Sequence, residues 1–331
     1  MNETLLNVND LKTYFFIAEG AVKAVDSVHL KIGVGEVLGL VGESGCGKST
    51  MALSIMRLIR HPGKIVGGEI WFEGENLLSK SEGEMRKIRG GKISMIFQNP
   101  MSSMNPVFTV GSQIAEAIKL HQDAQKHEVR EKVVEILGKV GIPSPSERVK
   151  DYPHEYSGGM LQRAMIAMAL SCNPKLLIAD EPTTNLDVTI QAQILELMRT
   201  VRKEFDASIL LIGHDFGVIS ELCDKVAVMY GGKLVEHADL ATIFKEAKHP
   251  YTQALLESIP RLDVETERLR IIPGSVPQLI NPHPGCRFCP RCEYAKEICS
   301  KEDPPLIEVG QGHSAACFLY GSIDKPNHQR K

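Results

Sequence analysis

Residues 42–50, GESGCGKST, place three glycines, a lysine, two serines and a threonine within nine positions. The spacing matches G-x-x-x-x-G-K-[ST], a loop whose backbone N–H groups surround phosphate oxygens, because glycine leaves room for close approach. We expect Lys48 to reach the β- and γ-phosphates of a nucleotide and Ser49 to ligate Mg²⁺. The predicted nucleotide-binding residues of this loop are Gly42, Ser44, Gly45, Cys46, Gly47, Lys48, Ser49 and Thr50.

The flanking sequence distinguishes a phosphate loop from a glycine-rich turn with an exposed lysine. EVLGLV before the loop predicts a buried strand, and STMALSIMRLI after it predicts a helix that is apolar at Leu53, Met56 and Ile59. The positive N-terminus of such a helix would point at the same anion as the loop. Strand, loop and helix in this order favour the phosphate loop.

A second motif supplies acids for the metal and for water. In PKLLIADEP, residues 174–182, four apolar residues precede Asp180 and Glu181. A buried strand would deliver Asp180 at its carboxyl end, where open α/β sheets bind ligands. We expect Asp180 to hold Mg²⁺ through water, and Glu181 to orient and polarise the attacking water. A carboxylate pair that caps a helix is the alternative.

A third motif indicates a second anion-binding helix terminus. PHEYSGGMLQRAMIAMAL, residues 153–170, sets Ser157, Gly158 and Gly159 before a helix rich in Ala, Met and Leu. One phosphate loop does not need a second terminus, whereas two chains facing head to tail would. At this point the sequence resembles the ATP-binding cassette (ABC) family, whose signature is LSGGQ; here the flanking positions are Tyr and Met.

The resemblance extends to two further elements of the hydrolytic site. MIFQNPMSSMNP, residues 95–106, resembles the Q-loop, and implies that Gln98 bridges Mg²⁺ and the attacking water. ILLIGHD, residues 209–215, resembles the switch region, and implies that His214 donates to the γ-phosphate and to water. The implied enzyme is an ABC-type ATPase, a translocase with Glu181, His214, Gln98 and Lys48 as its catalytic residues.

Two other elements of the family are implied by shorter motifs. TTNLDV, residues 183–188, resembles the D-loop and implies that Asp187 lies across a dimer seam. Tyr14, in LKTYF, fits the aromatic residue that stacks on adenine, although Phe15 and Phe16 are rivals.

The C-terminal part carries a narrower resemblance. It is similar to the C-terminal extension of dipeptide/oligopeptide importer ATPases, and the related nickel importers share much of this extension. Four segments carry the resemblance: HPYTQALLESIPRL (249–262), IPGSVPQL (272–279), GCRFCPRCEYAKEIC (285–299) and HSAACFLY (313–320). The resemblance implies a subunit that powers peptide import, with nickel or another small solute as the alternative cargo. It also implies a second ABC ATPase subunit (a sibling or the same chain), two membrane permease subunits and an extracytoplasmic solute-binding protein as partners.

Five of the eight cysteines lie after residue 285, at a spacing that suits zinc or an iron–sulfur cluster. In the importer family the recurrent cysteines match Cys286, Cys292, Cys299 and Cys317, and the resemblance implies a [4Fe–4S] cluster on these four. Cys289 would then be a spare thiol. Zinc on the same cysteines and no metal at all remain open.

The net charge and the lengths of the apolar runs indicate where the protein acts. The net charge of −3 does not favour nucleic acid, and no apolar run approaches the ~18–20 residues of a membrane helix. We expect a cytoplasmic protein that associates with the membrane through other chains.

The expected fold class is α/β: a P-loop NTPase of ABC type with a RecA-like core, an antiparallel β region and a helical subdomain at about 111–160. The predicted domains are an ABC ATPase over 1–259 and a small, irregular Cys-rich region over 260–331. Rival hypotheses are a non-transport ABC protein and a redox sensor; the single cassette argues against the first, and the intact Glu181 and His214 against the second.

Overall fold

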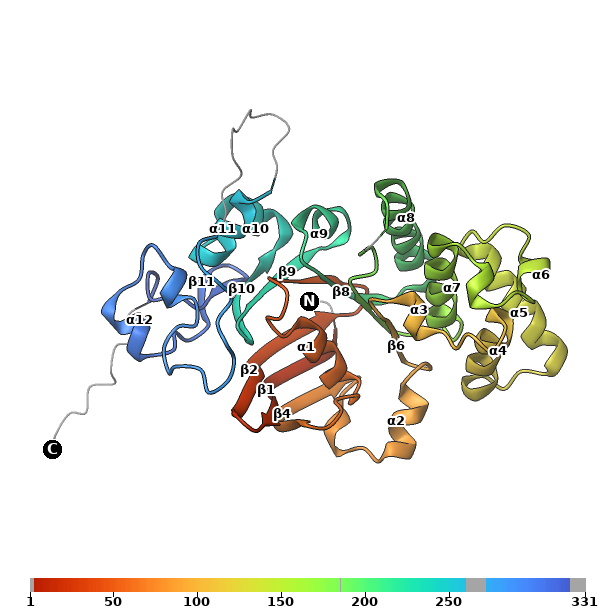
Figure 1. Ribbon diagram of the computed structural model, residues 1–331, viewed down its shortest axis with the longest axis horizontal. Helices are drawn as coiled ribbons and strands as arrows, with labels where there is room; N and C mark the ends of the chain where they lie inside the picture. The colour runs from red at the N-terminus through yellow and green to blue at the C-terminus, as the bar shows by residue number, and fades with distance from the viewer. Residues whose placement is uncertain (1–2, 185, 260–271, 322–331) are drawn as a thin grey trace.

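The computed structural model describes residues 3–184, 186–259 and 272–321. The described residues leave out Asn185 of the predicted D-loop. They also leave out 260–271 and 322–331 of the predicted C-terminal region. The described residues form one eight-stranded sheet and one four-stranded sheet, with helices around them (Figure 1).

The eight-stranded sheet has the order β11-β12-β10-β9-β3-β8-β7-β6. Its parallel strands are β3 (Val37–Val41), β6 (Ile93–Ile96), β7 (Leu176–Asp180), β8 (Ser208–Gly213) and β9 (Lys225–Tyr230). Every residue of β3, β7 and β8 is buried, as their continuous apolar sequences require in a parallel sheet covered on both faces. The carboxyl ends of these strands therefore meet at one edge.

The predicted hairpin at 226–237 is confirmed. Strand β9 pairs antiparallel with β10 (Lys233–Asp239), and the turn falls at Gly231 and Gly232, both with positive φ. The C-terminal region then adds β12 (His313–Ala315) beside β10, and β11 (Ile307–Gly310) beside β12. These short strands continue the central sheet, so this region contains more regular structure than its sequence indicates.

The four-stranded sheet is antiparallel, with the order β2-β1-β4-β5. Its strands are β1 (Thr4–Ile17), β2 (Gly20–Gly33), β4 (Gly63–Phe72) and β5 (Glu75–Asn76). Apolar residues of β1 and β2 share a buried cluster with β3 and with helix α1 (Lys48–Ile55). This packing confirms an antiparallel β contribution from the N-terminal part of the chain.

Helix α1 is shorter than the sequence pattern predicts. It ends at Ile55, because Arg57 adopts a left-handed φ of 51° and Leu58 N–H donates to the Leu53 carbonyl at 2.8 Å, a Schellman-type stop. Its buried apolar residues are Met51, Ala52 and Ile55, and of the predicted apolar positions Met56 is buried whereas Leu53 and Ile59 are only partly buried. Because both sheets enclose the helix, its apolar residues are not spaced along one face as they are in a surface helix.

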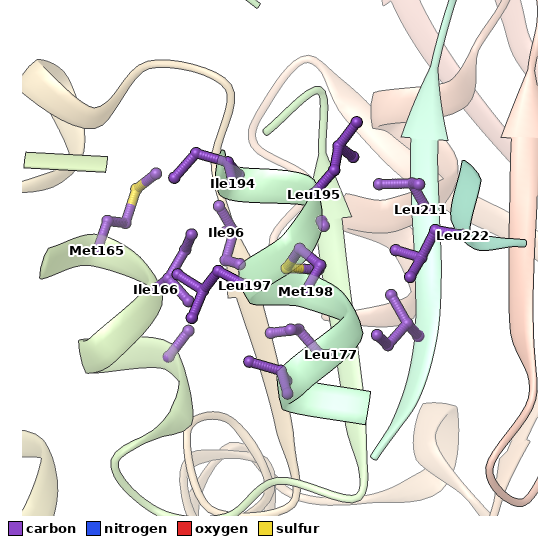
Figure 2. Packing of buried hydrophobic residues seen from close by; sticks show 14 of the residues in the cluster. Ile96, Met165, Ile166, Leu177, Ile194, Leu195, Leu197, Met198, Leu211 and Leu222 are labelled. Atoms are coloured by element: carbon purple, nitrogen blue, oxygen red, sulfur yellow. The ribbon is translucent and has the colours of Figure 1, made fainter. Parts of the chain in front are cut away.

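A second buried cluster covers the other face of the parallel sheet. Figure 2 shows side chains from α7 (Gly158–Leu170) and α8 (Val188–Phe205) packed beside residues of β7 and β8. Helix α9 (Phe216–Leu222) contributes Leu222 to the same cluster.

The segment between the Q-loop motif and α7 is helical, with α4 (Val110–His121), α5 (Lys126–Lys139) and α6 (Pro145–Arg148). The predicted buried face of α5 is confirmed at Val129, Val133, Ile136, Leu137 and Val140. These helices lie at one end of the molecule, and α12 (Glu297–Lys301) lies at the other (Figure 1). The remaining elements are η1 (Leu77–Ser79), α2 (Glu82–Ile88), α3 (Pro100–Ser103), η2 (Pro153–Glu155), α10 (Leu240–Glu246), α11 (Pro250–Glu257) and η3 (Cys289–Arg291).

Candidate nucleotide site

The phosphate loop connects β3 to α1, the strand–loop–helix context that the motif requires. Two of its three glycines, Gly42 and Gly47, pack closely against neighbouring backbone. A Cβ on Gly42 would lie 2.1 Å from the Met229 carbonyl oxygen, and one on Gly47 would lie 2.0 Å from the Ala24 carbonyl oxygen. Gly47 also has a left-handed φ of 108°. Cys46 is fully buried in this loop, whereas Ser44 and Gly45 face solvent and Thr50 is half-buried.

Two predicted metal ligands meet beside the loop lysine: Ser49 of the loop and Asp180 at the end of β7. Lys48 is 4% exposed, and its Nζ donates to the carbonyl oxygens of Gly42 at 2.7 Å and Glu43 at 3.1 Å. Ser49 Oγ donates to Asp180 Oδ1 at 3.1 Å. Burial raises the pKa of Asp180, and the neighbouring Glu181 charge raises it further. A hydroxyl and a carboxylate oxygen at this distance are a donor set that suits Mg²⁺.

Glu181 is the meeting point of the other predicted catalytic residues. Gln98 Nε2 donates to Glu181 Oε2 at 2.9 Å, and His214 Nδ1 lies 3.4 Å from Glu181 Oε1. Thr184 Oγ1 also donates to Glu181 Oε2 at 2.9 Å, a partner that the sequence motifs did not identify. Glu181 has a left-handed φ of 48°, a conformation that costs a non-glycine residue energy and often occurs at functional sites.

Tyr14 lies on β1, a strand that packs against helix α1. Thr13 and Ser54 share a hydrogen bond of 2.8 Å that joins β1 to α1. Tyr14 Oη donates to Asp26 Oδ1 at 2.5 Å. Burial, followed by the hydrogen bond to the Asp26 carboxylate, raises the pKa of the Tyr14 hydroxyl. The tyrosine is thus held by its hydroxyl, while its rival Phe16 is 49% exposed.

The signature residues lie apart from the phosphate loop of the same chain. Ser157 caps α7 by accepting the Met160 N–H at 3.3 Å, and Asp187 caps α8 by accepting the Ile190 N–H at 3.0 Å. Ser157 and Gly158 are exposed, and space is open around Gly158. Within the described ranges, no hydrogen bond joins Ser157, Gly158 or Gly159 to the phosphate loop. The terminus of α7 is therefore exposed and makes no hydrogen bond to the described residues of this chain's phosphate loop.

The five C-terminal cysteines line one largely apolar pocket with Phe288 and Phe318. Burial raises the pKa of Cys286 to about 12 and also raises the pKa values of Cys292 and Cys317. In the part of the chain that the structure describes, no three His, Cys, Asp or Glu side chains are close enough together to hold a metal ion. The structure therefore gathers the five thiols around one pocket.

A phosphate loop, a buried Asp180 followed by a Glu181 that contacts Gln98 and His214, and a second, exposed helix terminus are the features of an ATP-binding cassette of the ABC type. Residues 25–184 match the family described as ABC transporter, and residues 235–299 match the oligopeptide/dipeptide transporter C-terminal region.

Relatives match over almost their whole length. The oligopeptide transport ATP-binding protein AppD of Bacillus subtilis is 53% identical over 96% of this chain and 97% of its own. The dipeptide transport ATP-binding protein DppD of Escherichia coli is 47% identical over 95% of this chain and 96% of its own. This chain belongs to the ABC transporter family, in the group of oligopeptide/dipeptide transport ATP-binding proteins.

A solved structure supports the fold. A dimeric ATP-binding cassette in a post-hydrolysis state, bound to ADP and Pi, is 25% identical and has a TM-score of 0.65. The similarity covers 71% of this chain and 99% of that one. Among the described residues, no helix is both long and apolar enough to cross a bilayer.

Proposed function

We propose that this chain is the ATP-hydrolysing subunit that powers import of di- or oligopeptides from the cytoplasmic face of the membrane. The observation that carries this proposal is the full-length similarity to AppD and DppD, which includes the oligopeptide/dipeptide C-terminal region. Two permease subunits would form the membrane path, and an extracytoplasmic solute-binding protein would deliver the cargo. A nickel importer is the second candidate, because such importers resemble this chain in the same region.

The phosphate loop would hold the triphosphate. Lys48 would transfer its hydrogen bonds from the loop carbonyls to the β- and γ-phosphate oxygens, and the loop N–H groups would donate to the same anion. Ser49, Asp180 and Gln98 would hold Mg²⁺, which supplies positive charge at the phosphates. Tyr14 would stack on the adenine.

Glu181 would act on the water that attacks the γ-phosphorus. The water oxygen bonds to phosphorus, the bond to the bridging β–γ oxygen breaks, and ADP and inorganic phosphate leave. Glu181 accepts the proton of the water, while His214 donates to the developing phosphate charge. Gln98 and Thr184 both donate to one carboxylate oxygen, which leaves the other oxygen of Glu181 near His214. Catalysis is thus mainly positioning and charge stabilisation.

The exposed terminus of α7 would complete the site of a second subunit. Ser157, Gly158 and Gly159 would donate to the γ-phosphate bound by the partner, and Asp187 would lie at the seam between the two subunits. The open space at Gly158 leaves room for such an approach. The partner would be a second ABC ATPase subunit, either a sibling chain, which the family resemblance favours, or a second copy of this chain.

Residues 1–259 would form the ATPase domain, and 260–331 the C-terminal domain that the cysteines stabilise. Cys286, Cys292, Cys299 and Cys317 would hold a [4Fe–4S] cluster, or Zn²⁺ in its place, since soft thiolates suit both. The shared pocket supports this assignment. Either group would act as a structural staple for a region with little apolar core.

Glu181→Gln tests the hydrolytic assignment. The amide cannot accept the proton of water, so we expect kcat to fall about 100-fold or more while the ATP dissociation constant changes less than about twofold. Steady-state hydrolysis and equilibrium ATP binding measure the two quantities. A rate near that of the wild type would remove Glu181 from the role of base.

A further inference from the structure

Two arginines of the Cys286–Cys292 segment reach the nucleotide site. Arg291 lies between the last two cysteines of the segment, and its side chain is 5% exposed. Its guanidinium binds the Glu43 carboxylate in a bidentate manner, with Nη1–Oε2 at 2.7 Å and Nη2–Oε1 at 3.0 Å. Nε donates to the Pro273 carbonyl at 2.8 Å, and Nη1 donates to Tyr230 Oη at 3.2 Å. Nη2 also donates to the Ile272 carbonyl at 3.4 Å, so the arginine is held by four residues.

Glu43 is the second residue of the phosphate loop, and its backbone is held as well as its side chain. Its N–H donates to Tyr251 Oη at 2.8 Å, and its carbonyl accepts Lys48 Nζ at 3.1 Å. The rings of Tyr230 and Tyr251 both contact Phe288, which also belongs to the cysteine segment, with centroids 5.1 and 5.4 Å away. One rigid group of aromatic and charged side chains thus connects the cysteines to the loop.

The second arginine reaches the other end of the site. Arg287 forms a buried ion pair with Asp26 and donates to the Gly231 carbonyl. The same carboxylate accepts the Tyr14 hydroxyl at 2.5 Å. Tyr14 is the residue assigned to adenine, so both ends of the nucleotide site are tied to one short segment.

We propose that the Cys286–Cys292 segment positions the nucleotide site, with Arg291 setting the phosphate loop through Glu43 and Arg287 setting Tyr14 through Asp26. The proposal rests on the assignment of the loop and Tyr14 to nucleotide. Charge gives the physical reason: without Arg291, the Glu43 carboxylate would stand unneutralised beside a triphosphate, and the loop would lose its clamp. ATP affinity then depends on residues 248 positions beyond the loop in sequence.

The competing explanation is that Arg291 only fastens the C-terminal region to the ATPase. The chain offers a matched control for this in His313, whose Nε2 lies 2.7 Å from Glu236 Oε1 in a pair that is almost completely buried. This pair joins the same region to β10. Within the described ranges, His313 makes no hydrogen bond to the phosphate loop.

The experiment measures the dissociation constant of a fluorescent ATP analogue with Mg²⁺ on the full chain, together with thermal stability. We expect Arg291→Gln to raise this constant about tenfold, the size of one lost charge-assisted interaction. His313→Gln should lower the melting temperature and leave the constant within about twofold of wild type. In the assembled transporter, Arg291→Gln should raise KM for ATP by a similar factor with little change in kcat.

Two further variants keep the test decisive if Arg291→Gln does not fold. Arg291→Lys keeps the charge but not the bidentate contact, and should give a smaller loss. Cys292→Ser, next to Arg291, should weaken binding in the same direction, whereas Cys172→Ser in the helical region should not.

A double-mutant cycle with Glu43→Gln tests the pair itself. If Arg291 acts through Glu43, the double variant should bind ATP no more weakly than Arg291→Gln alone. Additive losses, or an Arg291→Gln variant that binds as tightly as wild type, would overturn the proposal. A wild-type chain that failed to bind ATP would instead overturn the proposed function, so the two failures are distinguishable.

Discussion

Glu181 shows how much of the site depends on single side chains. Its strained backbone places one carboxylate within reach of the Q-loop amide, the switch histidine and Thr184. The first two partners were predicted from motifs, but Thr184 was given no role from its motif. A hydroxyl three residues after a catalytic carboxylate is the pattern that could have indicated it.

At the residue scale, the buried His249 should make the stability of the fold depend on pH. His249 caps α11 by accepting the Tyr251 N–H at 3.0 Å, and burial lowers its pKa to about 3. An unfolded histidine titrates near pH ~6.5, so below that pH the unfolded chain binds a proton that the folded chain does not. The free energy of unfolding must therefore fall as pH falls from about 6.5 toward 3.

His249→Asn keeps a capping acceptor and removes the titration. Between pH ~7.5 and ~5, wild type should lose about 2 kcal/mol more stability than this variant. Urea unfolding at the two pH values measures the difference. Equal losses in both proteins would show that His249 does not titrate as its burial requires.

At the scale of elements, sequence patterns correctly predicted those features whose structure depends on residues close together in the chain. The phosphate loop, the β9–β10 hairpin and the buried face of α5 follow from glycine chemistry and periodicity. The end of α1 and most of its buried face did not, because the helix is enclosed by two sheets and stops at a left-handed Arg57. Strands β11 and β12 were missed because each has only three or four residues and pairs at the edge of a distant sheet. The contact of Arg291 with Glu43 spans 248 positions, and no local pattern encodes it.

The terminus of α7 carries its own prediction. Ser157→Arg puts a bulky side chain where the partner's phosphate is expected, so pairing with a second ATPase subunit in MgATP should be lost. Binding of ATP to the single chain should stay within about twofold of wild type, since the terminus lies apart from its own loop. Sedimentation velocity in the Glu181→Gln background follows the pairing.

Thr109→Arg is the matched control, because Thr109 caps α4 through the Ser112 N–H at 3.3 Å and its loss removes a hydroxyl cap of the same kind. Pairing should survive in that variant. If Ser157→Arg also paired normally, the α7 terminus would have no part in the nucleotide-sealed interface.

At the scale of the whole molecule, the helical region and the cysteine-bearing region lie on opposite sides of the nucleotide site. The helices α4, α5 and α6 lie at one end, the cysteine-bearing region lies at the other, and the phosphate loop is between them (Figure 1). The arginines of the C-terminal region connect that end to the nucleotide site. In the function proposed above, this chain would supply the phosphate loop and Glu181 for one ATP, a second ATPase subunit would complete the site, and membrane subunits would form the path for the peptide.

Uptake of a labelled oligopeptide into proteoliposomes tests this account most directly. The vesicles would hold the chain with its sibling ATPase and two permease subunits, with the solute-binding protein and peptide outside and MgATP inside. We predict uptake that requires ATP and is lost in Glu181→Gln. Uptake that continued at the wild-type rate in that variant, or ATP hydrolysis that moved no peptide, would contradict the assignment of this chain as the motor of peptide import.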